Sequence, residues 1–197
     1  MTIPTGYHDV DVGKLANVAT YLEMTAQPAP RPDPPGVSYV LARVAAPEPD
    51  WYRSLFQRIG EPWLWSSRLA MSDGELLRNV LDPLVEVYVL RSDGEDAGLL
   101  ELDFRSAGEC EIAFFGVLER VVGTGAGRWL MNRTLERAWA PTIRRVWVHT
   151  CNLDHPVALP FYIRSGFVPY KRQVEIYDDP RILGLQPETA APGVPIL

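Results

Sequence analysis

Hydrophobic and polar positions along the 197-residue chain fall into two kinds of pattern. Alternating or unbroken apolar runs predict strands over 19–24, 37–45, 85–90, 98–105, 109–118, 145–151 and 168–177. Apolar positions three and four apart predict helices over 50–59, 72–81, 125–139 and 154–165. From residue 37 the order is strand, two helices, three strands, helix, strand, helix and strand, which predicts one α/β domain.

Local signals mark the ends of the first two helices. Asp50 is a candidate N-cap and Gly60 a stop for the first, and Ser72 with Glu75 forms a capping-box pattern at the second. Residues 27–35 hold five prolines, which favour an extended connector, and we expect the strands on either side of it to form a hairpin-like pair. The chain is thus divided into an N-terminal strand with a Pro-rich connector, a central domain and a Pro-rich tail, over 1–36, 37–178 and 179–197.

Composition narrows the class of protein. Apolar residues make up 47% of the chain and the formal net charge is −6, with Lys14 and Lys171 the only lysines. Without clustered Lys or Arg to neutralise phosphates, nucleic acid is a poor candidate partner, whereas an acidic chain suits a cationic substrate. No apolar run reaches the ~18 residues of a membrane span and no export signal is visible, so we expect a cytoplasmic protein without a membrane partner. Cys110 and Cys151 lie in apolar runs and are expected to be reduced.

A glycine-rich segment between a predicted strand and a predicted helix is the first candidate binding site. Gly123, Gly125 and Gly127 let the backbone approach a ligand, and their N–H groups with the helix N-terminus can bind an anion such as pyrophosphate. The segment is not a P-loop, which ends in Gly-Lys-Ser/Thr, and Arg128 stands where a dinucleotide fingerprint has its third glycine. Its spacing from Arg120 fits Arg/Gln-x-x-Gly-x-Gly/Ala, the pyrophosphate loop of acyl-coenzyme A transferases. A glycine-rich turn that binds no ligand is the alternative.

A second motif lies downstream of this loop. Asn152 is followed by Ala158 and then by Tyr162, and the segment ends in a Gly-Phe pair. With the strand and the glycine loop before it, this order resembles the GNAT superfamily of acyl-coenzyme A N-acyltransferases across residues 109–170, and more weakly back to residue 37. The resemblance implies a GNAT-like α/β (α+β) fold, with a mixed, mostly antiparallel central sheet flanked by helices.

The resemblance also implies roles for particular residues. The pyrophosphate would be held by the loop residues Arg120, Val122, Gly123, Thr124, Gly125, Ala126, Gly127 and Arg128. The sheet would open between strands 109–118 and 145–151. Pantetheine would bind there along Phe115, Gly116, Val117, Asn152 and Ala158. Tyr162 would protonate the leaving thiolate, and Pro160 is expected to kink the short helix that carries this tyrosine.

Strand parity in the hairpin before the glycine loop points to a general base without reference to any family. Matching the apolar faces of the two strands leaves a three-residue loop and sets Asp103 opposite Glu111, with Phe115 and Val117 on the face of Glu111. Like charges that face each other are unfavourable, so one carboxyl is expected to keep its proton to higher pH. Such a base suits amine acylation, because an ammonium must lose a proton before it attacks. We predict Glu111 as the base, acting directly or through one water, with Asp103 as its modulator; a solvated acidic face without a catalytic task is the alternative.

Aromatic residues between the first two helices complete the candidate site. In GNAT-like folds this segment commonly covers the acceptor. We therefore expect Trp63 and Trp65 to wall the acceptor pocket and Glu61 to bind an ammonium, although core packing accounts equally well for both tryptophans. His149 shares a strand face with Trp147, and it is either a proton relay or a hydrogen-bonded structural histidine.

Together these residues predict an N-acetyltransferase in which an amine attacks acetyl-coenzyme A directly in a ternary complex, without a metal. The acceptor, a small molecule or a protein, is left open, and the strand edges are compatible with a homodimer. One alternative is a catalytically weak acyl-coenzyme A sensor or interaction module with the same fold. A glycine-loop protein that binds ATP or NAD rather than coenzyme A is another.

Overall fold

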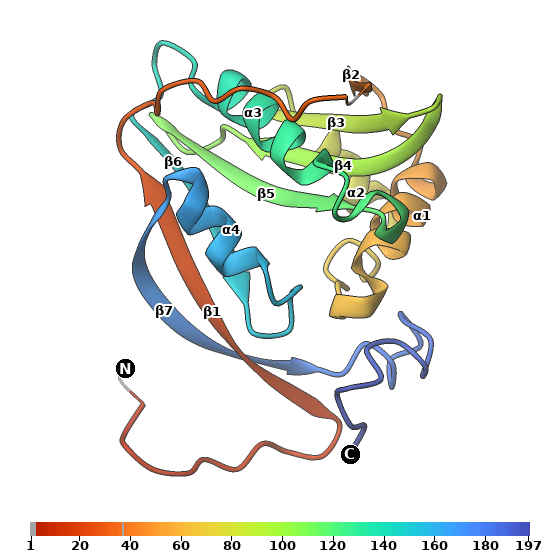
Figure 1. Ribbon diagram of the computed structural model, residues 1–197. Helices are drawn as coiled ribbons and strands as arrows, with labels where there is room; N and C mark the ends of the chain where they lie inside the picture. Colours follow the sequence, from red (N-terminus) through yellow and green to blue (C-terminus); the bar gives the residue numbers. More distant parts are fainter. Residues whose placement is uncertain (1–2, 37) are drawn as a thin grey trace.

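A seven-stranded sheet in the order β2-β3-β4-β5-β6-β1-β7 forms the centre of the molecule in the computed structural model, which describes residues 3–36 and 38–197 (Figure 1). The strands are β1 (Lys14–Met24), β2 (Tyr39–Arg43), β3 (Val85–Ser92), β4 (Glu95–Asp103), β5 (Glu109–Val117), β6 (Arg145–Cys151) and β7 (Val168–Asp178). The helices are α1 (Pro49–Gly60), α2 (Asp73–Val80), α3 (Ala126–Ala138) and α4 (Ala158–Ser165), with 3₁₀ turns η1 (Glu61–Trp63) and η2 (Glu119–Val121). Neighbouring strands pair antiparallel, except for β5 and β6, which are parallel. The predicted mixed, mostly antiparallel sheet is confirmed.

The helices cover the two faces of the sheet in separate layers. Helices α3 and α4 pack on one face, where Trp129, Leu130 and Tyr162 belong to one apolar cluster. Helices α1 and α2 pack on the other face, where Phe56 and Leu76 belong to a second cluster. Because successive strand residues point to opposite faces, the central strands contribute to both clusters and separate them. The sheet therefore has one large core on each side.

The expected pairing of the two strands that flank the Pro-rich connector is wrong. Strand β1 lies between β6 and β7, while β2 pairs with β3 at the opposite edge of the sheet. The connector spans this distance by crossing α3, where Asn132 Nδ2 donates hydrogen bonds to Arg31 O at 3.0 Å and to Asp33 Oδ1 at 2.7 Å. Its prolines keep it extended, so it cannot form the tight turn of a hairpin. Val37, at the start of the expected second strand, lies outside the described residues.

Helix α1 starts one residue earlier than expected, whereas the start of α2 agrees with the prediction. The N-cap of α1 is Glu48, followed by Pro49, and Asp50 lies in the first turn instead. At α2 the capping box of Ser72 and Glu75 is confirmed in both directions.

Helix α4 begins four residues later than expected. The carboxylate of Asp154 accepts hydrogen bonds from Thr150 Oγ1 and Cys151 N, both at 2.8 Å, and so it closes a loop after β6 rather than a helix. Pro160 is then the third residue of α4, where the backbone N–H has no helical partner in any case. The expected kink at Pro160 is therefore avoided.

A β-bulge in the hairpin of β4 and β5 changes which side chains share a face. Asp103 lies opposite Glu111, as predicted, but the register shifts between Glu101 and Leu102. Beyond the shift Phe114 packs toward α1, with its ring centroid 4.9 Å from that of Phe56, and Phe115 turns toward α4. The expectation that Phe115 and Val117 share the face of Glu111 is wrong, because parity cannot reveal an inserted residue.

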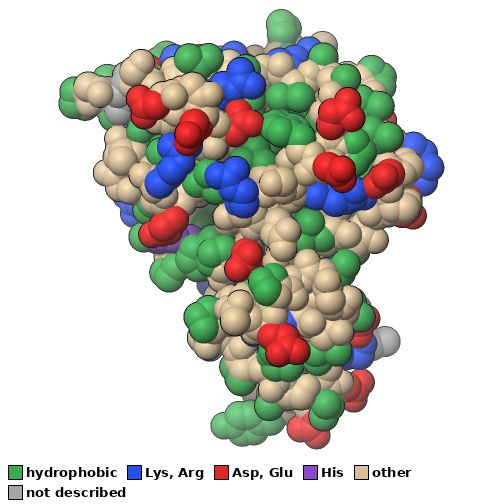
Figure 2. All heavy atoms as spheres, turned by 90° about the vertical axis from the view of Figure 1, so that its right-hand side faces the viewer, with side chains coloured by type: hydrophobic (Ala, Val, Ile, Leu, Met, Phe, Trp, Pro, Cys, Tyr) green, Lys and Arg blue, Asp and Glu red, His purple; other side chains and the backbone are tan. Residues whose placement is uncertain are grey.

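A narrower lobe, formed by the far ends of β1 and β7 with the C-terminal tail, extends from the broad part of the sheet (Figures 1 and 2). The tail has turns but no helix or strand among residues 179–197. It is held by the buried pair Asp179–Arg181, whose guanidinium also donates to Ala190 O and Val194 O. Lys and Arg side chains alternate with Asp and Glu over the face seen in Figure 2. Within the described residues, every helix is too short or too polar to cross a membrane.

Candidate active site

The pairing of β5 with β6 opens in the middle of the sheet. Only three residue pairs join the two strands, from Glu109 with Arg145 to Glu111 with Trp147. Beyond this point β5 keeps its pairing with β4 but is no longer paired with β6. The backbone of residues 115–117 therefore faces a gap in the sheet, with Glu111 at the point where the gap begins.

The pKa of Glu111 lies near neutral pH, so its carboxyl can both take up and release a proton there. Burial, and then the facing carboxylate of Asp103, raise its pKa to about 7, against the partly offsetting charge of Arg68. At Asp103 burial works in the same direction, but hydrogen bonds and charge from Arg105 outweigh it and lower the pKa of that carboxyl. Of the two facing carboxyls, Glu111 is therefore the one that keeps its proton to higher pH.

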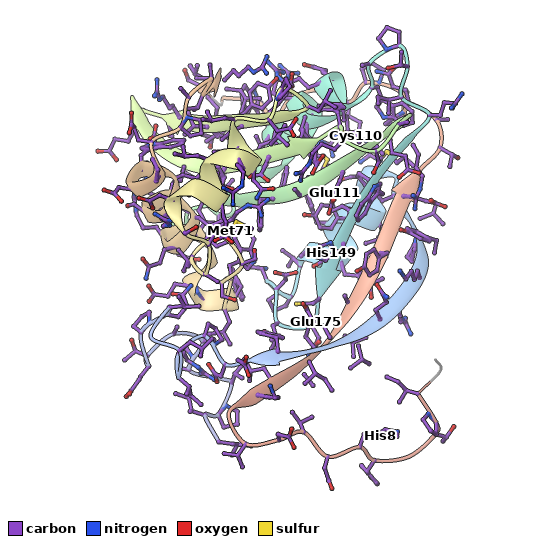
Figure 3. All side chains as sticks on the ribbon, turned by 180° about the vertical axis from the view of Figure 1, so that it is seen from behind. His8, Met71, Cys110, Glu111, His149 and Glu175 are labelled. Carbon is purple, nitrogen blue, oxygen red and sulfur yellow. The ribbon has the colours of Figure 1, made fainter. Side chains whose placement is uncertain are left out.

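Side chains beside Glu111 form an aromatic and acidic floor on the face of the sheet opposite α3 and α4 (Figure 3). The ring of Tyr21 stacks on those of Trp147 and His149, with centroids 6.1 and 5.2 Å apart. His149 Nδ1 lies 3.8 Å from Glu111 Oε1, and burial lowers the pKa of His149 against the raising effect of nearby carboxylates. Glu175 continues the floor along β7. The alternation of side chains along the strand predicted that Trp147 and His149 share a face. No sequence signal placed Tyr21 and Glu175 beside them, since strands β1 and β7 come from opposite ends of the chain.

A hollow of about 230 Å³ adjoins this floor at the turn of the β4–β5 hairpin. It is lined by Asp103, Arg105, Ser106, Glu111 and Trp147. The indole Nε1 of Trp147 is buried and has no hydrogen-bond partner within the part of the chain that the structure describes. The hollow thus brings the Asp103–Arg105 ion pair and the carboxyl of Glu111 together.

A buried ion pair next to Asp103 anchors the segment between η1 and α2, and sequence reasoning missed it. Glu101 is 1% exposed and accepts hydrogen bonds at 2.5 Å from Tyr52 Oη and from Arg68 Nη2. The guanidinium of Arg68 also lies over the ring of Phe114, 4.9 Å from its centroid. Glu101 lies two residues before Asp103 on β4 and so shares its face, but Arg68 lies in an irregular loop whose course the sequence does not specify. The contact fixes this loop over the site.

The glycine loop has the open backbone that an anion site requires. Gly123 and Gly125 have φ values of 81° and 91°, and a Cβ at Gly123 or Gly127 would meet no atom within 4 Å. Gly125 is the N-cap of the 13-residue helix α3 and provides no side chain to cap its first N–H groups. These groups are therefore available to phosphate oxygens, so the loop fits a pyrophosphate.

The side chains of the loop point away from this open backbone. Thr124 Oγ1 donates to Val121 O at 2.7 Å and lies 2.6 Å from Tyr39 Oη. Arg120 turns back to Glu95, and Arg128 lines a small hollow under the Pro-rich connector, where its Nε is buried without a partner among residues 3–36 and 38–197. Ala126 is buried and Val122 is exposed. An anion at this loop would thus be held by the backbone.

Tyr162 lies on the face of the sheet that α4 covers, whereas Glu111 lies on the opposite face. Its ring packs between Phe115 and Phe167 in the α4 core, with centroids 6.1 and 5.9 Å away. Burial, and then the charge of Asp154, raise the pKa of Tyr162 above its ordinary value. Its hydroxyl therefore stays protonated and can donate a hydrogen bond at neutral pH.

Asn152 and Ala158 border the same gap. Asn152 Oδ1 accepts a hydrogen bond of 2.6 Å from Val18 N of β1, which leaves its NH₂ group for other contacts. Ala158 begins α4 and packs against the cluster that contains Tyr162.

The tryptophans after α1 close one end of the site but differ in their packing. The ring of Trp65 lies against Phe56 and Phe114, and its Nε1 donates to Asp154 Oδ1 at 3.0 Å. Trp63 contacts the ring of His155 edge-on at 5.0 Å. Glu61 begins η1 and is partly exposed. Trp65 is thus a packing residue that joins the loop after α1 to the loop before α4.

The family model for the acetyltransferase (GNAT) family matches residues 48–167, which is more than half of the chain. The chain therefore belongs to this family. No protein of known, curated function matches the sequence.

Solved structures share the fold at low sequence identity. A conserved protein of unknown function from Staphylococcus epidermidis is 17% identical with a TM-score of 0.61, over 85% of this chain and 63% of its own. A GCN5-related N-acetyltransferase from Sphaerobacter thermophilus is 18% identical with a TM-score of 0.61, over 92% of this chain and 54% of its own. An aminoglycoside acetyltransferase from an uncultured soil metagenomic sample is 16% identical with a TM-score of 0.53, over 65% of this chain and 87% of its own. The chain thus spans about 60% of the length of the first two structures.

Metal ligands do not gather at the site. Within residues 3–36 and 38–197, no group of three or more His, Cys, Asp or Glu side chains could hold a metal ion. Cys110 and Cys151 are free, and burial raises the pKa of both thiols.

Proposed function

We propose that this protein is an N-acetyltransferase that moves an acetyl group from acetyl-coenzyme A to a cationic amine. The observation that carries the proposal is the position of Glu111, a carboxyl with a pKa of about 7, at the point where the β5–β6 pairing opens. The open glycine loop and the free backbone of residues 115–117 lie along the same gap and suit a pyrophosphate followed by the amides of pantetheine.

In this proposal the acceptor amine binds on one face of the sheet, and the group that meets the leaving sulfur lies on the other face. The acceptor ammonium binds on the floor beside Glu111, where Asp103 and Glu175 favour a positive charge. Glu111 takes a proton from the ammonium, and the neutral amine attacks the thioester carbonyl. As the C–S bond breaks, the surplus proton on the new amide nitrogen passes to the departing sulfur, so that coenzyme A leaves as the thiol. Tyr162, on the α4 side, meets the departing sulfur with its hydroxyl. Because the pKa of Tyr162 is raised, a hydrogen bond that stabilises the thiolate is its main contribution.

Titration calorimetry with acetyl-coenzyme A tests the first half of the proposal, with ATP and NAD as competing ligands. Gly123→Glu should abolish binding, since it places a carboxylate where a phosphate would lie. Gly94→Glu is the matched control, because Gly94 has the same φ of 81° and the same empty surroundings but lies in the β3–β4 turn. Binding of ATP or NAD instead, or an equal loss in both variants, would refute the loop assignment.

Turnover tests the second half. An amine panel screened by release of free thiol should yield an acceptor whose turnover falls about 100-fold or more in Glu111→Gln and less in Tyr162→Phe. If acetyl-coenzyme A binds tightly but no amine in the panel is acetylated, the sensor or interaction module becomes the better account. The binding and turnover measurements thus separate the two functions.

A further inference from the structure

The edge strand β7 is largely exposed. Ten of its 11 residues are exposed to solvent, and in the described part of the chain only β1 pairs with it. Val168, Val174 and Ile176 are 64, 45 and 56% exposed. The opposite edge of the sheet, β2, has only 5 residues. A long edge strand with apolar side chains in water is a template for pairing with a further strand.

Apolar residues also continue from β7 onto its neighbour. Val174 lies opposite Val18 of β1, which is 44% exposed, and Ile176 lies opposite Ala16. Helix α4 covers the upper part of this face and leaves the lower part bare (Figure 1). The bare face and the unpaired edge therefore belong to one surface, formed by residues 16–18 and 171–177.

The charge pattern of β7 is complementary to itself. Two copies of a strand that pair antiparallel about a twofold axis normal to the sheet must have this axis at a residue, because opposed residues share a face. An axis at Gln173 sets Lys171 opposite Glu175 and Glu175 opposite Lys171. An axis at Arg172 would oppose the two Arg172 side chains, which is unfavourable. The axis at Gln173 thus gives two ion pairs and no facing like charges among residues 171–175.

We propose that this protein forms a homodimer in which two β7 strands pair antiparallel about Gln173 and join the two sheets into one. The pairing covers residues 171–175 at least. Pro169, which has no N–H, and the bulge between Tyr21 and Leu22 end it on one side. The neighbouring apolar surfaces around Val18 and Val174 then adjoin each other along the new seam.

The dimer would also extend the floor of the candidate active site. Lys171 and Glu175 lie on the face of Tyr21: Lys171 Nζ is 4.6 Å from the centroid of its ring, and Glu175 accepts a hydrogen bond from Asn17. Glu175 Oε1 remains for Lys171 of the second copy. The floors of the two copies therefore meet at the seam and form one continuous surface.

Exchanging the charges at Lys171 and Glu175 tests the predicted register of the two β7 strands, and it needs no acceptor substrate. Sedimentation velocity should give a dimer for the wild type. Lys171→Glu and Glu175→Lys should each weaken the dimer by about tenfold or more, because each turns two attractive pairs into repulsive ones. Mixing the two variants in equal amounts should restore a heterodimer, since both of its pairs are again opposite in charge.

Arg172→Glu is the control, because it makes the same change in net charge at a position opposite Val174. It should weaken the dimer less than Lys171→Glu does. A wild type that stays monomeric at micromolar concentrations would overturn the proposal, and so would a dimer that neither variant weakens. Failure of the mixture to restore association would overturn the register. None of these results depends on acyltransferase activity.

Discussion

Glu111 should make the protein less stable as the pH rises toward neutrality. Its pKa in the folded protein is about 7, against an ordinary value of 4.5, so the folded state holds this proton more tightly than the unfolded chain does. Between these two values the unfolded state binds fewer protons, and the free energy of unfolding falls with rising pH. The contribution is complete below pH 4.5 and lost above pH 7.

The magnitude follows from the size of the shift. The difference between about 7 and 4.5, at ~1.4 kcal/mol for each pH unit, gives about 3.5 kcal/mol as an upper value. The Glu111 side chain is 25% exposed, so solvent screening reduces this to about 2 kcal/mol. Glu111→Gln removes the titrating group. The variant should therefore match the wild type near pH 4.5 and exceed its stability by about 2 kcal/mol at pH 8.

Urea unfolding at several pH values measures this difference directly. The quantity of interest is the variant minus the wild type, because other carboxyls titrate equally in both. Glu119→Gln, at an exposed position on η2, is the matched control for the loss of one carboxyl. Parallel curves for the wild type and Glu111→Gln would refute the raised pKa and, with it, the argument for Glu111 as the base.

Three further predictions concern packing and charge near the site. Arg68→Ala should destabilise the protein by about 3 kcal/mol, because Glu101 would remain buried without its cation. Urea unfolding measures this loss. Adding Glu101→Leu should recover part of it, and no recovery would contradict the ion-pair account. Gly116→Ala should lower the free energy of unfolding by about 1–3 kcal/mol, because the new Cβ would lie 2.4 Å from Ile59 Cγ2. At Gly127 a new Cβ meets open space, so Gly127→Ala should have little effect on stability. Tyr162→Phe should change stability by less than about 1 kcal/mol, because the ring packing is kept, while turnover falls; a large loss of stability would show that the hydroxyl has a structural role.

Local sequence patterns predicted the elements well where short-range physics decides them. The capping box of Ser72 and Glu75, the limits of β6 and the facing of Asp103 and Glu111 all depend on residues close together in the chain. The patterns failed where long-range contacts decide. The helix predicted from residue 154 begins only at Ala158, because the carboxylate of Asp154 accepts hydrogen bonds from Thr150, Cys151 and the distant Trp65.

The candidate site was predictable only in part for the same reason. Glu111 and the glycine loop were visible from parity and spacing. The floor of Tyr21 and Glu175 was not, because β1 joins the sheet between β6 and β7 rather than beside β2. The bulge in β5 was hidden too, since one extra residue reverses all faces beyond it without changing the apolar composition of the strand.

The separation of the two large cores by the sheet has a practical consequence for enzyme engineering. The glycine loop and Tyr162 adjoin the core under α3 and α4, whereas Glu111 and the floor beside it lie on the opposite face. Side chains on the floor can thus be randomised with little effect on the half that would hold the donor. A library at Tyr21 and His149, which leaves β7 intact, therefore tests whether the floor selects the acceptor.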